Sequence, residues 1–307
     1  MMKTKIMIPN TDIEIHPLGL GTANAGLAWD GKNADRIFDA FLDMGGSLID
    51  TAHVYSDWVK PERARSERVI GDWLERSGKR NYIVLSTKGG HPDMTVPNPD
   101  THISRMRKED MESDLDSSLK QLRTDYIDIY FYHRDDERQS VEELIEVMEE
   151  FRRKGKIRYY GCSNWTTPRM KAADRYCSEK GYRGFVANQA LLNLGYKYMN
   201  PLEDDTLVYA DEEMQQYHRE HTGNLLMPYM GVCGGFFHKY IGQGPDAVKR
   251  SPYYTEGNLK VAERVKELCD KYHATVSQVV LGFFGQQDVD CAPLYGPQNA
   301  DQIEEAM

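Results

Sequence analysis

Four side chains capable of proton transfer stand at or just beyond the ends of three apolar segments. They are Asp50, Tyr55, Lys88 and His133. A free phenol has a pKa near ~10 and is a poor acid at neutral pH, but a nearby ammonium lowers that pKa. We therefore expect Asp50 to hold Lys88 in place, Lys88 to lower the pKa of Tyr55, and His133 to orient a substrate carbonyl by hydrogen bonding.

Such a set suits protonation of a developing alkoxide, which is the acid half of carbonyl reduction. It supplies no hydride, so the chemistry requires a nicotinamide cofactor. Singly, each residue has an ordinary explanation: Asp50 suits a helix cap, and Tyr55 is one of 19 tyrosines. Lys88 is harder to explain, because an unpaired ammonium buried after an apolar strand is costly. The joint occurrence at three strand ends favours a functional interpretation.

The elements that must position these residues alternate between strands and helices. The patterns predict strands at 18–21, 46–50, 83–88, 126–133, 157–161, 185–188, 225–229 and 291–294. They predict helices at 33–44, 66–74, 108–122, 140–155 and 259–269, and further helices from 167, 275 and 299. The helix that begins at Ser66 is expected to be capped, and Thr167 is expected to cap a helix with Pro168 at its first position. A small hairpin is expected over 6–14.

Alternation of this kind implies a parallel sheet. Eight units favour a closed (β/α)8 barrel, or TIM barrel, and we expect residues 1–307 to form one domain. Three long connections, at 89–107, 193–221 and 230–258, follow strands and are expected on the C-terminal, catalytic face.

The composition limits the partners of the chain. Its 48 acidic and 38 basic residues give a formal net charge of -10, which argues against nucleic acid or an anionic membrane as the main partner. No apolar run approaches the roughly 20 residues of a membrane span, and no signal peptide is visible after Met1. Five cysteines without a CxxC pair indicate neither a disulfide framework nor a thiolate zinc site. A cytoplasmic protein acting on a small-molecule carbonyl or alcohol is expected; the sequence leaves the oligomeric state open.

Several short motifs occur in order along the chain: 18–22, 46–55, 88–89, 126–133, 155–164 and 188–189. On these motifs the chain resembles the aldo-keto reductase superfamily over almost its whole length. The resemblance implies an NAD(P)-dependent carbonyl reductase on a barrel, with Asp50, Tyr55, Lys88 and His133 as its catalytic tetrad. The run 133–136, His-Arg-Asp-Asp, further resembles a bacterial branch of the superfamily that is often discussed near sugar metabolism.

The resemblance also implies a cofactor site. Ser163, Asn164 and Gln189 match residues that hold the nicotinamide carboxamide, and Tyr229 matches the aromatic residue that stacks on the ring. The other implied cofactor contacts are Gly21, Thr22, Asp50, Met230, Gly231, Gly235, Phe236, Gly296, Gln298, Gln302 and Glu305.

The choice of cofactor is the main departure from the pattern. The superfamily favours NADP(H), and many relatives carry a basic residue at positions matching Gln298 or Gln302. No Lys or Arg occurs in 295–307, and a phosphate dianion without a basic partner binds less well. We therefore expect a weakened preference for NADP(H), or use of NAD(H).

Two alternatives stay open. A metal-dependent barrel hydrolase or isomerase would use His133, Asp135, Asp136 and His91, although it leaves Lys88 unexplained. A non-catalytic relative would bind nucleotide and act through a protein partner, although the complete tetrad gives no support to loss of activity. The favoured function needs no metal. The charged and aromatic loop residues suit a polyhydroxylated or anionic carbonyl compound, and a sugar-like substrate is one candidate.

Overall fold

The structure, a computed structural model, describes residues 4–221 and 223–307. Residues 1–3, on which the expected absence of a signal peptide partly rests, lie outside the described residues. The strands are β1 Ile6–Met7, β2 Glu14–Ile15, β3 Gly19–Gly21, β4 Leu48–Asp50, β5 Val84–Gly89, β6 Ile127–Tyr132, β7 Ile157–Ser163, β8 Ala187–Gln189, β9 Leu225–Leu226 and β10 Leu294–Tyr295. The α-helices are α1 Gly31–Asp43, α2 Arg65–Ser77, α3 Lys108–Leu122, α4 Val141–Arg153, α5 Thr167–Lys180, α6 Glu212–Glu220, α7 Phe236–Gln243, α8 Glu256–Tyr272, α9 Val276–Gly282 and α10 Asp301–Ala306.

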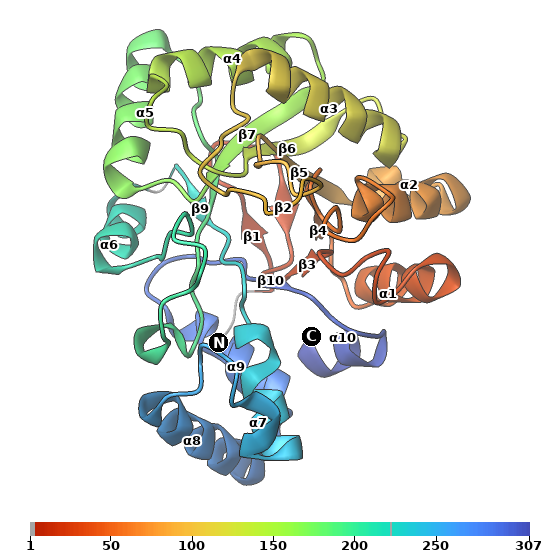
Figure 1. Cartoon of the computed structure of the whole chain (residues 1–307), viewed down its shortest axis with the longest axis vertical. Helices are drawn as coiled ribbons and strands as arrows, with labels where there is room; N and C mark the ends of the chain where they lie inside the picture. Colours follow the sequence, from red (N-terminus) through yellow and green to blue (C-terminus); the bar gives the residue numbers. More distant parts are fainter. Residues whose placement is uncertain (1–3, 222) are drawn as a thin grey trace.

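Eight parallel strands form one sheet in the order β10-β3-β4-β5-β6-β7-β8-β9. Its two edges meet, because the Ala292 N–H donates to the Leu226 carbonyl at 3.0 Å and the Leu294 N–H donates to the Pro228 carbonyl at 2.8 Å. Helices lie around the strands (Figure 1). The expected (β/α)8 barrel is confirmed. Among the helices of the described residues, none is both long enough and apolar enough to cross a membrane.

Burial on both faces explains why the central strands read as apolar runs. All six residues of β6 are buried, and the strand pairs with β5 on one side and β7 on the other. The boundaries of the last two barrel strands differ from expectation. β9 is only two residues long, since Pro228 has no N–H to donate. The last strand forms at 294–295, and Cys291 makes only an isolated bridge to Leu226.

Two expected helix caps are wrong. α2 begins after Ala64, which makes no side-chain cap, and Ser66 lies inside the helix. The Ser66 hydroxyl instead bonds the hydroxyls of Thr22 and Thr51, each at 2.8 Å. α5 begins after Thr166 rather than Thr167, again without a side-chain cap. Pro168 is then the second helical residue, where it has no N–H for a capping oxygen.

The N-terminal hairpin closes one end of the barrel. β1 and β2 pair antiparallel with Ile6 opposite Ile15, which confirms the expected hairpin. Its buried isoleucines belong to one apolar cluster with residues inside the barrel, among them Phe131 and Met227. In the connecting turn, Asp12 accepts a hydrogen bond from the Tyr159 hydroxyl at 2.7 Å. The opposite, C-terminal end of the strands is therefore the end left for a site.

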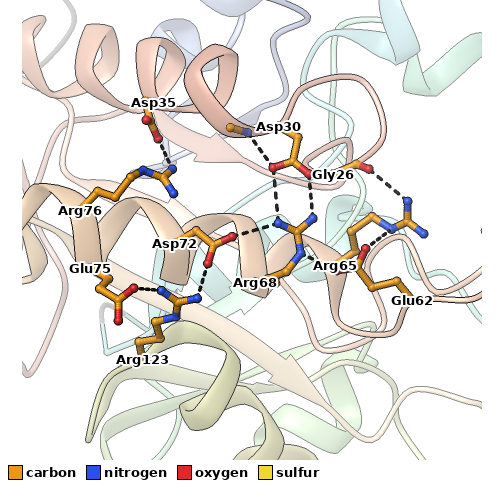
Figure 2. A network of polar contacts seen from close by, with 11 residues as sticks. Gly26, Asp30, Asp35, Glu62, Arg65, Arg68, Asp72, Glu75, Arg76 and Arg123 are labelled. Atoms are coloured by element: carbon orange, nitrogen blue, oxygen red, sulfur yellow. Dashed lines mark hydrogen bonds and ion pairs between the residues drawn. The ribbon is translucent and has the colours of Figure 1, made fainter.

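An ion-pair network on the outside of the barrel links its first three helices (Figure 2). Arg68 on α2 contacts Asp30, at the start of α1, at 2.7 Å, and Asp72 at 3.0 Å. Arg123, at the end of α3, also pairs with Asp72. Arg68 further pairs with Glu62, which lies in the loop that follows Tyr55. Single surface pairs contribute little to stability, so we take the network mainly as a constraint on how this loop is placed.

Candidate active site

Parallel register brings the proton-transfer residues together. β4, β5 and β6 are neighbours in the sheet, so Asp50, Lys88 and His133 lie at adjacent C-terminal strand ends. The Lys88 ammonium donates to Asp50 Oδ2 at 2.6 Å, to the Thr51 carbonyl at 2.7 Å and to the Tyr55 hydroxyl at 3.1 Å. All three ammonium hydrogens are used. The ammonium therefore joins the carboxylate to the phenol.

The Asp50 carboxylate is held by two further donors. The Ser86 hydroxyl and the Gln189 amide each donate to Oδ1 at 2.7 Å. Ser86 is a site residue that the sequence reasoning missed. A signal was present, because Ser86 stands two residues before Lys88 on β5, and alternate residues of a strand face the same side. Ser86 is also directly opposite Asp50 in the register of the sheet.

The pKa of Tyr55 differs from the expectation, whereas Lys88 is charged as expected. Burial raises the pKa of Tyr55, and the opposing effect of Lys88 only partly offsets it. The expected lowering of the Tyr55 pKa is therefore wrong. Burial also lowers the pKa of Lys88, but the Asp50 carboxylate and Tyr55 outweigh it, so the net pKa is raised. At neutral pH the pair is an ammonium beside a neutral phenol that still holds its proton.

His133 is a neutral imidazole next to this pair. Burial, with smaller contributions from His91, Arg134 and Lys88, lowers its pKa well below the usual value. Its ring meets that of Tyr55 edge to face, with centroids 5.7 Å apart. Within the described residues, Nδ1 is buried without a hydrogen-bond partner. A polar ring beside the phenol is suited to hydrogen-bond a substrate oxygen.

A cavity of about 320 Å³ opens over these residues. Ten of the residues expected to bind cofactor line it: Gly21, Thr22, Asp50, Ser163, Asn164, Gln189, Tyr229, Met230, Gly231 and Gly296. The other five do not line it. Gly235 directly precedes α7, and the Phe236 ring is buried against Phe237 and Tyr253. Gln298, Gln302 and Glu305 lie in or before α10, where the Gln302 side chain accepts a hydrogen bond from the Gln298 N–H at 2.7 Å.

The polar groups of the cavity fit a carboxamide. The Asn164 amide donates to the His133 carbonyl and to the Ser163 hydroxyl, both at 3.1 Å, and accepts from the Tyr229 hydroxyl at 2.7 Å. Asn164 is therefore occupied in fixing its neighbours. Among residues 4–221 and 223–307, no hydrogen bond occupies the Ser163 hydroxyl proton or Gln189 Oε1, which gives a donor and an acceptor for a nicotinamide amide.

The segment that follows Tyr229 fits phosphate groups. Met230, Cys233, Gly234 and Gly235 all have a left-handed backbone, with φ between 56° and 77°. Gly234 lines the cavity, and a Cβ added there would meet nothing within 4 Å. Such a backbone can come close to an anion. The cavity walls thus suit both ends of a nicotinamide mononucleotide unit.

The carboxylates of the metal alternative are paired with arginines. Asp135 contacts Arg169 at 2.8 Å, and Asp136 contacts Arg138 at 2.8 Å. Across residues 4–221 and 223–307, no group of three or more His, Cys, Asp or Glu side chains is arranged to hold a metal ion. The metal alternative therefore has no arranged ligand set in the described part of the chain.

Comparison with known proteins decides the family. The family model described as the aldo/keto reductase family matches residues 17–307. The chain belongs to the aldo/keto reductase family. It is 37% identical over 312 residues to "Aldo-keto reductase YhdN" of Bacillus subtilis, covering 97% of this chain and 86% of that protein. It is 28% identical over 303 residues to "Uncharacterized oxidoreductase YrpG" of the same organism, covering 97% and 88%. It is 27% identical over 243 residues to "Aryl-alcohol dehydrogenase [NADP(+)]" of Phanerodontia chrysosporium, covering 75% and 58%.

The cavity of this aldo/keto reductase also contains residues that sequence reasoning did not place in it. Asn24 comes from the loop after β3, and Leu207 and Val232 come from two of the long connections. Those connections were expected on the catalytic face, but nothing in their sequence indicates that Leu207 and Val232 line the cavity. A second group lies behind Lys88, where His53 is 3.5 Å from Glu67 and 3.7 Å from Asp114.

Proposed function

We propose that the chain is an NAD(P)H-dependent oxidoreductase that reduces an aldehyde or ketone to an alcohol, or catalyses the reverse reaction. The observation that carries the proposal is Lys88, whose ammonium contacts both Asp50 and the Tyr55 hydroxyl inside a cavity shared with His133. A lysine buried this completely, with 1% exposure, needs its partners. The arrangement suits proton transfer better than a purely structural ion pair, because it ends on a phenol that faces a cavity.

In this proposal the side chains divide the work. The neutral Tyr55 hydroxyl gives its proton to the substrate carbonyl oxygen, and the adjacent Lys88 ammonium stabilises the phenolate that remains. His133 hydrogen-bonds the same oxygen and orients it. Asp50 keeps Lys88 charged and in place. A nicotinamide cofactor supplies the hydride when it is bound, and Ser163, Gln189 and Tyr229 would hold its ring half.

A Tyr55→Phe variant tests the proton donor. It should lose most turnover of any aldehyde that the wild type reduces, yet keep its affinity for cofactor, because the phenyl ring preserves the packing. Tyr176→Phe is the matched control: that hydroxyl bonds Glu146 at 2.8 Å, and neither residue lines the cavity. Full turnover by Tyr55→Phe would refute the assignment.

The choice between the two cofactors belongs to the proposal as well. Family membership favours NADP(H), and one matched relative carries NADP(+) in its name. Against this, 295–307 contains no Lys or Arg, and its exposed acidic residues include Asp301 and Glu305. Negative charge there disfavours a 2′-phosphate. We infer that NAD(H) is used at least as well as NADP(H). Fluorescence titration with NADH and NADPH decides this, and much tighter binding of NADPH would refute it.

The substrate class is best approached by a screen. Aldoses, ketoses and simple aldehydes should be assayed with both cofactors and in both directions. Aromatic aldehydes belong in the panel, because matched relatives are named as aryl-alcohol dehydrogenases.

A further inference from the structure

The walls of the active-site cavity carry one positive charge that no other wall residue compensates. The charged side chains that line it are Asp50, Lys88 and Arg134. Asp50 and Lys88 form an ion pair at 2.6 Å and neutralise each other. Arg134 follows His133 directly, and its residue is only 8% exposed. A buried guanidinium cannot lose its proton, so an anionic carboxylate must lie near it.

The carboxylate beside Arg134 comes from a surface connection, not from the barrel. Asp204 accepts from Arg134 Nη2 at 3.0 Å, while Nε donates to the Thr206 hydroxyl at 3.0 Å and Nη1 donates to the His133 carbonyl at 3.1 Å. Asp204 does not line the cavity, and its side chain is 25% exposed. Two of the three partners of Arg134 thus belong to one irregular segment of the long connection before α6.

That segment holds itself in shape by local contacts. The Thr206 N–H and hydroxyl donate to Asp204 Oδ1 at 3.0 and 2.5 Å. The neighbouring Asp205 turns the other way, with 73% side-chain exposure, and contacts His102 at 2.9 Å. Only Asp204 Oδ2 meets the guanidinium. Because Asp204 is partly hydrated, exchange of its carboxylate for another anion costs less than it would in a sealed core.

We propose that Arg134 is a specificity-determining residue that binds a carboxylate group of the substrate, and that Asp204 occupies this position when no such substrate is bound. The inference rests on the proposed carbonyl reduction and narrows it to carbonyl compounds that carry a carboxylate. Arg134 adjoins His133 in sequence and shares its cavity, so one substrate reaches both: its carbonyl lies at Tyr55 and His133, and its anionic end lies at Arg134. The planar fork of arginine suits a carboxylate.

The test compares the affinities of two stable alcohol ligands that differ in charge. Isothermal titration measures the Kd of 4-(hydroxymethyl)benzoate and of 4-methylbenzyl alcohol for the wild type and three variants, with either reduced cofactor present so that no hydride acceptor is available and the alcohols are not turned over. Arg134→Met should weaken binding of the benzoate relative to the neutral alcohol by about tenfold to a hundredfold, the effect of losing a hydrogen bond to a charged group. Asp204→Asn should shift the ratio the other way, by about tenfold, since a competing carboxylate is removed.

Asp205→Asn is the matched control. It makes the same change of charge one residue away, at a side chain that contacts His102 and not Arg134, so it should leave the ratio unchanged. A structural role for the Arg134–Asp204 pair predicts that Asp204→Asn weakens both ligands alike, and that result overturns the proposal. So does an unchanged ratio in Arg134→Met. If Arg134→Met folds poorly, the ratio measured for Asp204→Asn still decides whether the proposal holds.

The proposed function fails by a different measurement. If the wild type binds the benzoate with the expected preference but reduces none of the aldoses, ketoses and aldehydes of the screen, 4-carboxybenzaldehyde and 4-methylbenzaldehyde included, with either cofactor, the carbonyl reductase proposal is refuted and the anion site stands. If both aldehydes are reduced without an Arg134-dependent preference for the carboxylate, the anion site is refuted and the reductase proposal stands.

Discussion

The replacement of Asp50 by Asn isolates the contribution of the buried carboxylate to folding. In the wild type, Asp50 and Lys88 are both 1% exposed and lie 2.6 Å apart. Asparagine fills nearly the same volume but carries no charge. Its oxygen can still accept from Ser86 or Gln189, which turns its amino group toward the Lys88 ammonium. A donor then faces a donor, and the ammonium is left with the Thr51 carbonyl and Tyr55 only.

The expected cost follows from the burial. Removing one partner of a buried ion pair destabilises proteins by about 3–5 kcal/mol, a large part of the roughly 5–15 kcal/mol that stabilises a typical native state. The cost depends on pH. In the wild type the raised pKa of Lys88 gives stability that is present below its unfolded pKa and lost as pH rises through the folded value. In Asp50→Asn, burial without the carboxylate lowers that pKa, so the variant gains stability as pH rises toward about 10.

Urea unfolding at pH 7 and at pH 10, followed by tryptophan fluorescence and circular dichroism, measures both effects. The difference between wild type and Asp50→Asn should be about 3–5 kcal/mol at pH 7 and should shrink at pH 10. A double-mutant cycle with Lys88→Met completes the test. The double variant should lose less stability than the sum of the single variants, because it no longer buries an unpaired charge.

Two results would contradict this reasoning. A cost below about 1 kcal/mol at pH 7 would mean that the pair behaves as an exposed surface ion pair. A cost that stays constant between pH 7 and pH 10 would mean that the ammonium of Lys88 is not the group responsible.

Two further predictions concern packing and protonation. Gly71→Ala in α2 should lower the free energy of unfolding, measured with urea, by about 3 kcal/mol or more, because a Cβ there would overlap the backbone carbonyl oxygen of Gln121. Gly282→Ala, at the end of α9 where an added Cβ meets nothing within 4 Å, should instead raise it by about 0.4–1 kcal/mol. Equal effects at the two positions would show that packing is not the cause. The imidazole of His133 should remain neutral down to well below pH 6, since burial holds its pKa far under the usual value; an NMR titration assigned with a His133→Gln variant checks this, and a midpoint near 6.5 would contradict it.

Much of the architecture could be predicted from local patterns. The apolar runs of β5 and β6, the glycine after α1 and the capping residues of α8 and α9 are local features, and they set the element types almost without tertiary information. The misplaced caps show the limit. Ser66 reads as a cap, but the fold gives its hydroxyl two threonine partners from other loops, and long-range bonds of that kind leave no trace in spacing.

The candidate site likewise has features that the sequence could predict and features that required the tertiary structure. Types and order of residues were enough to single out Asp50, Tyr55, Lys88 and His133 as a possible proton-transfer set. The net pKa of Tyr55 could not be predicted, because it depends on how deeply the phenol is buried compared with how close the ammonium comes. Ser86 was within reach of the strand period, but its bond to Asp50 required the register between β4 and β5.

By itself, the sequence determined the barrel, its catalytic end and the chemistry that its strand ends can carry, because strand periodicity and residue type are local properties. Beyond Met230 and Gly231, the tertiary structure alone decided which residues of the long connections face the cavity. Those segments have no period that fixes which side chain turns inward, so Leu207 lines the cavity and Asp204 meets Arg134 only through the path of the folded chain. The positive charge of Arg134 is therefore balanced by a carboxylate that only the folded path of the chain brings to it.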